Sequence, residues 1–158
     1  MPPDMKSANA DADAAAAQAL AEQVRDVMWE GDRASKMLGM RITSIGPGRA
    51  SLQMTVREDM LNGHAICHGG LITTLADSSF AFACNSYNVL TVASGFSVDL
   101  MAPGRLGDVL TATCSELSKA GRTGVYDVQV HNQHGERIAV FRGRSYTVRG
   151  KPVIPPAP

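Results

Sequence analysis

The most informative part of this sequence is Asn62-Gly63-His64-Ala65-Ile66-Cys67-His68-Gly69-Gly70-Leu71-Ile72-Thr73-Thr74-Leu75-Ala76-Asp77. Gly69 and Gly70 open a segment of helical character that runs to about Cys84. Glycine leaves backbone N–H groups unshielded, and the first N–H groups of a helix have no intrahelical acceptor and lie at the positive end of its dipole. The pattern indicates a site for a developing oxyanion. A helix start with a purely structural role is the other interpretation.

A single acidic residue, Asp77, interrupts the apolar helix. An ionised carboxylate there is costly unless it is paired or used in chemistry. Gly69 and Asp77 are eight residues apart, or roughly 12 Å along a helix axis, whereas reacting atoms must lie about 3 Å apart. If both serve one reaction, they must come from different chains, as in a twofold dimer with antiparallel helices. Alternatively, Asp77 faces a solvent-filled gap or bonds Thr73.

Alternating residues before the helix predict β-strands, and further strand candidates, separated by turn residues, follow the helix. Two strands precede it, at about 40–45 and 51–57, and four follow it, at about 90–101, 108–118, 124–132 and 137–148. The breaks between strands are short, so we expect a largely antiparallel sheet. The helix is apolar nearly all round, which predicts an α+β fold in which the sheet wraps around it.

The N-terminal region has a different composition, with nine alanines in residues 8–21. Alanine is the strongest helix former, so we expect a helix over about 13–29, disorder before about residue 10, and a short second helix over 32–38 capped by Asp32. The chain therefore divides into a helical, partly disordered arm (1–34), one domain (35–149) and a loose Pro-rich tail (150–158).

Composition excludes several classes of protein. The 158 residues are 44% apolar and 19% charged, which fits one globular domain with an extra segment. Lys+Arg and Asp+Glu are both 15, which argues against a nucleic-acid binder with a broad basic surface. No apolar run is long enough to span a membrane, and the N-terminus does not resemble a secretory signal. Three cysteines make no disulfide framework, so we expect a cytoplasmic protein.

Other residue groups suggest weaker alternatives. His64, Cys67 and His68, with Asp77 as a fourth ligand, suggest a metal site, but adjacent Cys and His make awkward ligands for one ion. Cys67 as a nucleophile has no support beyond its neighbouring histidine. Basic residues bracket a tight turn or share the face of a strand, which suits phosphate oxygens or merely solubilises an edge: Lys119, Arg122, Arg142 and Arg144.

The combination of Asn62, His68-Gly69-Gly70 and Asp77 resembles the hotdog-fold acyl-CoA thioesterases, in particular the PaaI type of phenylacetate degradation. The likeness covers about residues 35–149 and includes Pro103-Gly104, Gly107-Asp108 and Phe141-Arg142-Gly143. The resemblance implies a long central helix wrapped by a curled antiparallel sheet. It also implies a homodimer with shared active sites and a pairing of dimers into a homotetramer.

The resemblance further implies hydrolysis of acyl-CoA thioesters, of the phenylacetyl-CoA or hydroxyphenylacetyl-CoA type, without a cofactor or metal. Asp77 would be the nucleophile or general base, and the partner chain's glycine N–H at position 69, aided by Gly70, would polarise the carbonyl. Asn62 and His68 match positions that orient the thioester and the water. Ser94 lies near a water-holding position, and the CoA phosphates would lie near Lys119, Arg122 or Arg142. The alternative is a hotdog module that binds acyl-CoA without turnover.

Overall fold

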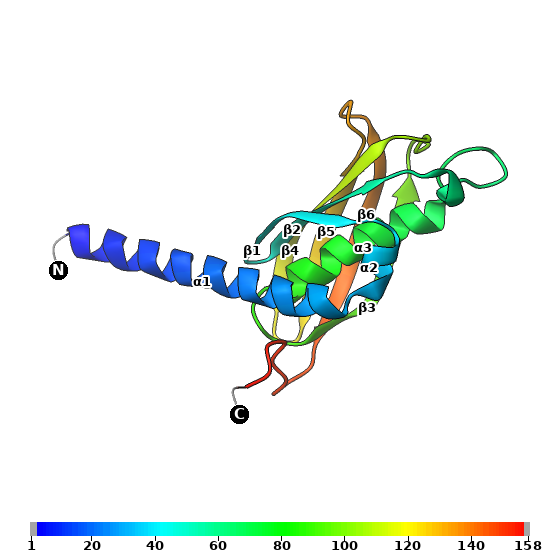
Figure 1. The fold of residues 1–158 in the computed structure, drawn as a ribbon. Coiled ribbons are helices and arrows are strands. Elements are labelled where there is room, and N and C mark those ends of the chain that lie inside the picture. Colours follow the sequence, from blue (N-terminus) through cyan, green and yellow to red (C-terminus); the bar gives the residue numbers. More distant parts are fainter. Residues whose placement is uncertain (1–2, 157–158) are drawn as a thin grey trace.

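Figure 1 shows a computed structural model in which residues 3–156 are described. The helices are α1 (Pro3–Gly31), α2 (Arg33–Met37) and α3 (Gly69–Asn85), with a short 3-10 helix, η1 (Glu58–Met60). The strands are β1 (Arg41–Gly46), β2 (Arg49–Thr55), β3 (Thr91–Leu100), β4 (Val109–Ala120), β5 (Thr123–His131) and β6 (Arg137–Thr147). The predicted order of two strands, one long helix and four strands is confirmed.

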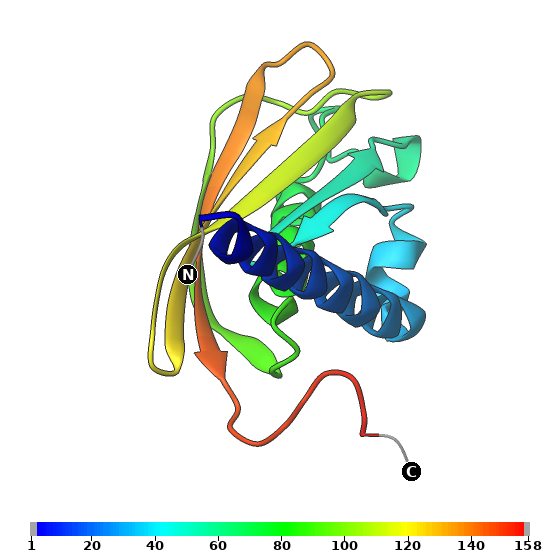
Figure 2. The ribbon, with the colours of Figure 1, turned by 90° about the vertical axis from the view of Figure 1, so that its left-hand side faces the viewer.

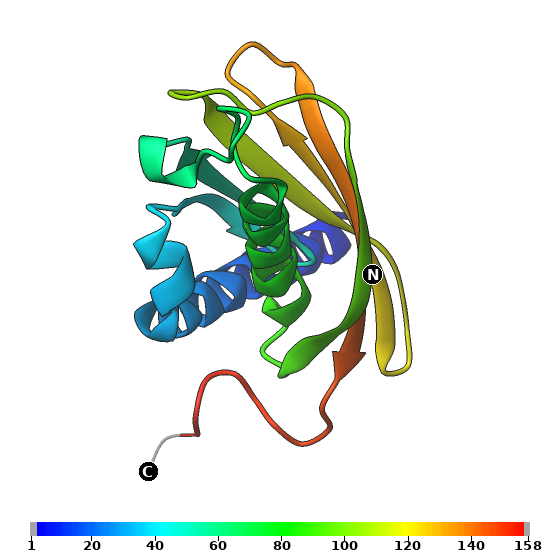
Figure 3. The same ribbon diagram turned by 90° about the vertical axis from the view of Figure 1, so that its right-hand side faces the viewer.

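The six strands form one antiparallel sheet in the order β1-β2-β4-β5-β6-β3. The sheet curls around α3 without closing into a barrel, as Figure 3 shows. Two strands lie at the edges, β1 at one and β3 at the other. The predicted α+β hotdog architecture, with an N-terminal helix outside it, is therefore what the structure has.

The inner face of the sheet packs on α3 through aromatic rings. Phe80 of α3 is buried, and its ring centroid lies 5.4 Å from that of Tyr126 and 6.0 Å from that of Phe141. Burial of such a side chain contributes about 1.5–3 kcal/mol to stability. Gly143 lies under this ring, where a Cβ would come within 2.8 Å of the Phe80 side chain. The fold therefore requires glycine at this position of β6.

One face of α3 stays only partly covered. Gly70 is exposed and Thr73, Asp77 and Ala81 are half-buried, whereas Leu75 and Ala76 on the sheet side are fully buried. The helix is apolar nearly all round, as expected, but the sheet covers only part of it. The uncovered face carries Asp77.

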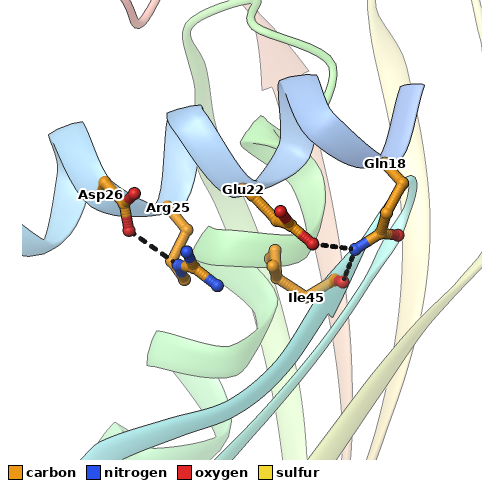
Figure 4. A network of polar contacts seen from close by, with 5 residues as sticks. All are labelled: Gln18, Glu22, Arg25, Asp26 and Ile45. Atoms are coloured by element: carbon orange, nitrogen blue, oxygen red, sulfur yellow. Dashed lines mark hydrogen bonds and ion pairs between the residues drawn. The ribbon is translucent and has the colours of Figure 1, made fainter. Parts of the chain in front are cut away.

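The helix α1 starts earlier than the sequence pattern predicted, at Pro3 rather than near Asp13. Its second half is attached to the domain by buried Ala21 and Val24 and by the Gln18 side chain. Gln18 Nε2 donates to the Ile45 carbonyl at 2.8 Å and to Glu22 Oε1 at 2.9 Å (Figure 4). Residues 8–16 are exposed, and this half of α1 extends away from the sheet (Figures 1 and 2). The disorder expected for residues 1–2 lies outside the described residues.

Two further expectations concern the segments flanking the sheet. Asp32 does cap α2, since its Oδ1 accepts a hydrogen bond from the Ser35 N–H at 3.0 Å. The C-terminal tail, expected to be loose, is attached to the loop after α3 by hydrogen bonds at both ends of Lys151–Ile154. Leu90 N–H donates to the Lys151 carbonyl at 2.8 Å and Ile154 N–H to Asn88 Oδ1 at 2.8 Å. The expectation for residues 157–158 falls outside the described part of the chain.

The three cysteines, Cys67, Cys84 and Cys114, are buried and form no disulfide with one another. Burial raises the pKa of the Cys84 thiol to about 12, which makes it inert at neutral pH. Within residues 3–156, the helices contain no segment that is both long and apolar enough to cross a bilayer.

Candidate active site

The loop that leads into α3 is held by its own hydrogen bonds. Asn62 Oδ1 accepts from the His64 N–H at 2.9 Å and from the Ile66 N–H at 3.4 Å, and the Asn62 N–H donates to the Ile66 carbonyl at 2.8 Å. The His68 N–H donates to the Met60 carbonyl at 2.9 Å. These bonds fix the backbone just before Gly69. Asn62 uses its side-chain carbonyl oxygen for the loop, and it is also one of the residues that line the adjacent pocket.

His68 is the N-cap of α3, and its side chain selects which helix amide is open. Its Nδ1 accepts a hydrogen bond from the Gly70 N–H at 3.0 Å. A neutral imidazole that accepts at Nδ1 carries its proton on Nε2, so His68 presents a donor outward. Among the described residues the Gly69 N–H has no hydrogen-bond acceptor. The open donor at this helix start is therefore Gly69, while the Gly70 amide is occupied.

A pocket of about 410 Å³ borders this helix start. It is lined mostly by apolar side chains around Asn62 and Gly69, namely those of Ile66, Cys67, Ile72, Leu100, Met101, Ala102 and Pro103. Leu100 of β3 lies directly on Gly69, because a Cβ built at position 69 would come within 2.5 Å of Leu100 Cδ1. Any side chain at position 69 would therefore displace Leu100 from this pocket.

Asp77 lies in a different pocket, of about 350 Å³, between α3 and the start of β3. Its carboxyl group forms no ion pair and no hydrogen bond with any residue that the structure describes. The alternative interpretation, a bond from Thr73, is not seen: Thr73 Oγ1 donates to the Gly69 carbonyl at 2.9 Å. Burial without a partner raises the pKa of the Asp77 carboxyl above its ordinary value of 3.8. A half-buried carboxyl of this kind is typical of a catalytic acid or base.

One chain thus brings together four of the predicted site residues and leaves the fifth apart. Asn62, His68, Gly69 and Gly70 lie at the start of α3, whereas Asp77 lies two turns further on, in the second pocket. Both Gly69 and Asp77 lie on α3, so the helix itself holds them roughly 12 Å apart along its axis.

The remaining predicted residues occupy the surface. Ser94 is the extra residue at a bulge of β3, and its Oγ donates to the Arg144 carbonyl at 3.0 Å. Lys119 lies over the Tyr87 ring, 4.3 Å from its centroid, just beyond the end of α3. Arg122 donates from Nη1 to the Tyr146 hydroxyl at 2.7 Å. Lys119 and Arg122 are exposed and form no ion pair with a described carboxylate, so their charge is available to an anion.

Arg142 differs from the other two cations because its charge is neutralised. It forms a bidentate ion pair with Asp127, with Nε–Oδ1 at 2.7 Å and Nη2–Oδ2 at 2.8 Å. Its neighbours Phe141 and Gly143 face Phe80 of α3, and side chains alternate along a strand, so Arg142 points to the outer face of the sheet. Asp127 was not foreseen as its partner, since the pairing depends on the register between β5 and β6.

The residues considered for metal binding or thiol chemistry are dispersed. Cys67 is buried, and burial raises its thiol pKa, whereas His64 is exposed and His68 uses Nδ1 for the helix cap. Between residues 3 and 156, no three His, Cys, Asp or Glu side chains form a cluster able to hold a metal ion.

A curled antiparallel sheet around one long helix, with an open amide at the helix start and an isolated carboxyl in mid-helix, defines the hotdog class of thioesterases. The family profile of the thioesterase superfamily matches residues 64–139. The acyl-coenzyme A thioesterase PaaI of Escherichia coli is 46% identical over 123 residues, 78% of this chain and 88% of that protein. This chain belongs to the thioesterase superfamily, and the PaaI-type resemblance inferred from the sequence is confirmed.

Solved structures agree with this assignment. The E. coli PaaI protein, from the phenylacetic acid degradation operon, superposes with a TM-score of 0.83 at 43% identity, over 85% of this chain and 97% of that one. A mutant PaaI from Thermus thermophilus gives a TM-score of 0.72 at 32% identity, over 74% of this chain and 100% of that one. A Streptococcus mutans protein with bound acetyl-CoA gives a TM-score of 0.67 at 26% identity, over 69% of this chain and 88% of that one.

Proposed function

We propose that the protein hydrolyses acyl-CoA thioesters to a free acid and CoA, and that aryl-acyl groups such as phenylacetyl or hydroxyphenylacetyl are its substrates. This proposal rests on one observation: the Asp77 carboxyl is half-buried and has no ion-pair or hydrogen-bond partner among the described residues. A protein that only bound acyl-CoA would gain nothing from such a group. The similarity to an E. coli acyl-CoA thioesterase and to a structure with bound acetyl-CoA supports the substrate class.

In the proposed reaction the Gly69 N–H donates to the thioester carbonyl oxygen. This bond strengthens as negative charge grows on that oxygen in the transition state. Asp77 of the partner chain either attacks the carbonyl carbon, giving a mixed anhydride that water hydrolyses, or takes a proton from the attacking water. In both routes the C–S bond breaks, and the CoA thiolate leaves and is protonated. The proposed route uses only the Gly69 N–H, the Asp77 carboxylate and water, without a metal or cofactor. CoA enters as part of the substrate.

Asn62 and His68 complete the first half of the site. Asn62 lines the pocket beside Gly69, and His68, the residue before Gly69, is exposed at the helix start. We assign them to orienting the thioester and the water. Gly70 contributes by holding His68 through its N–H rather than by binding the carbonyl. Ser94 would contribute a hydroxyl that holds water from the exposed bulge of β3.

A dimer through β3 would unite the two halves. β3 is an edge strand, and its apolar side chains Phe96 and Leu100 are 44% and 53% exposed. The Gly69 pocket borders the end of this strand at Leu100, and the Asp77 pocket borders its start at Thr91–Ala93. If two β3 strands pair antiparallel about a twofold axis near Phe96, the start of each lies against the end of the other. Each Asp77 then faces the partner's Gly69 pocket.

We assign the CoA phosphates to Lys119 and Arg122, whose charges have no carboxylate partner in the described chain, rather than to the neutralised Arg142. Pairing of two dimers into a homotetramer rests on the family resemblance. A cytoplasmic location is supported by the three buried free thiols. The zero net charge gives no support to a nucleic-acid partner.

Steady-state hydrolysis of a panel of aryl and straight-chain acyl-CoAs tests the proposal. We expect turnover that falls by about 10²–10⁴-fold in Asp77→Ala, the usual loss when general-base help is removed. Asp13→Ala, which changes an exposed acid on α1, is the matched control. Tight binding of acyl-CoA without turnover by the wild-type protein would favour the non-catalytic module instead.

A further inference from the structure

We propose that α1 and the C-terminal tail limit the length of the acyl group, and that Met28 and Val153 are the specificity-determining residues. The proposal rests on the function proposed above and names the wall that selects the substrate. It predicts a preference for compact acyl groups, of arylacetyl or short-chain size, over long straight chains.

The pocket that holds Asp77 has three walls. The α3 wall consists of Asp77, Phe80, Ala81 and Cys84, and a second wall is the start of β3. The third wall comes from outside the sheet–helix unit, with Met28 of α1 and Val153 of the tail. An acyl chain bound beside Asp77 would therefore meet Met28 and Val153 if it extended away from the carbonyl between these walls.

Met28 is held in this position by its neighbours on α1. Val24, one turn earlier, is buried, and the Trp29 ring lies 6.3 Å from the Phe82 ring of α3. These contacts fix the end of α1 beside α3, and Met28 itself packs partly buried on the core. The thioether side chain of methionine is flexible and fills irregular gaps, which suits a wall that touches a ligand.

Val153 is held by backbone hydrogen bonds on both sides. Lys151 accepts from the Leu90 N–H and Ile154 donates to Asn88 Oδ1, both at 2.8 Å. These bonds attach the tail to the loop between α3 and β3, which also forms the pocket. Met28 and Val153 both lie outside residues 35–149, the range assigned to the family resemblance from sequence motifs, so none of those motifs includes the third wall.

A hydrophobic wall discriminates by about 10–200-fold for each methylene that fails to fit. The test measures kcat/KM for butanoyl-, hexanoyl-, octanoyl-, decanoyl- and phenylacetyl-CoA. We expect Met28→Ala to raise the ratio of kcat/KM for decanoyl-CoA to kcat/KM for hexanoyl-CoA about tenfold, and Val153→Phe to lower the same ratio. Val27→Ala, on the exposed side of α1, and Ile154→Ala, next to Val153 but not in the pocket, are the controls.

A second measurement separates this proposal from the proposed function. Calorimetry gives the affinities of S-alkyl-CoA thioethers, which cannot be hydrolysed, for the same variants. If the protein hydrolyses acyl-CoA and no variant changes its chain-length profile, the role of Met28 and Val153 is overturned and the proposed function stands. Thioether affinities that shift with Met28→Ala in a protein without turnover overturn the proposed function and support the wall. A protein that shows neither turnover nor thioether binding would overturn both proposals. Val153→Phe alters only the tail and so tests the wall even if Met28→Ala does not fold.

Discussion

His68 Nδ1 accepts the Gly70 N–H at 3.0 Å, and this bond leaves the preceding amide, that of Gly69, as the first open donor of α3. The cap thus has two effects. It stabilises the helix start, and it occupies the Gly70 N–H so that the Gly69 N–H is the one left open beside the pocket. Both effects can be measured.

Loss of the cap should destabilise the fold. His68→Ala removes the acceptor for the Gly70 N–H, which we expect to lower the free energy of unfolding by ~1 kcal/mol, as for other N-cap residues. His68→Asn supplies an oxygen at the same position and should retain most of the stability. Urea unfolding at matched protein concentration measures both. Equal losses in the two variants would contradict the capping role.

Asp77 should make the native protein less stable at neutral pH. Because burial raises its pKa in the folded state, the folded protein binds the proton more tightly than the unfolded chain does. The stability contributed by this group therefore falls as the pH rises from about 3.8, the ordinary value, through the raised pKa. We expect Asp77→Asn to raise the Tm at pH 7 and to lower turnover by about 10²–10⁴-fold, with the Tm difference shrinking toward pH 4. A lower Tm in Asp77→Asn at pH 7 would show that the carboxylate is stabilised by a partner.

The shared site predicts complementation between two inactive variants. Asp77→Ala retains the Gly69 amide, and Gly69→Leu retains Asp77 while its side chain displaces Leu100. Random exchange of subunits should restore about a quarter of the wild-type activity, since half the dimers are hybrids with one intact site of two. Native mass spectrometry verifies the exchange. Hybrid dimers without activity would place both groups of each site in one chain.

The effect of removing a basic residue on KM should depend on whether that residue already has a carboxylate partner. Lys119→Ala and Arg122→Ala should raise KM for acyl-CoA on the order of tenfold, because each removes a charge that can bond a phosphate. The same variants should leave KM for acyl-pantetheine, which lacks the phosphates, unchanged. Arg142→Ala is the control, since Asp127 already neutralises that cation. An increase of KM in Arg142→Ala alone would move the phosphate site to the outer face of the sheet.

The sequence was sufficient for the fold because its signals are local. Alternation marked β1 and β2, the turn residues between segments delimited the four later strands, and the apolar segment after Gly69-Gly70 marked α3, whose end at Asn85 lies one residue from the expected position. The distance between Gly69 and Asp77 followed from helix geometry alone. The family likeness then supplied the curled shape of the sheet, which no local pattern contains.

The contacts that were missed depend on tertiary placement. The pairing of Arg142 with Asp127 follows from strand register, and the position of Met28 beside Asp77 follows from the direction in which α1 leaves the domain. The attachment of the tail through Asn88 was equally hidden, since proline-rich segments carry no periodic signal. The helix also began ten residues before Asp13, at Pro3, and proline at the first position of a helix is a start signal that the alanine count did not take into account.

The fastening of the C-terminus has a practical consequence for handling the protein. Removing the segment that carries Val153 would take away one wall of the cavity beside the carboxyl group. The first half of α1 extends away from the sheet (Figure 1), so purification handles and immobilisation linkers belong at that end of the chain. Under the proposed role of Val153, enzyme shortened at the C-terminus would show a changed substrate range.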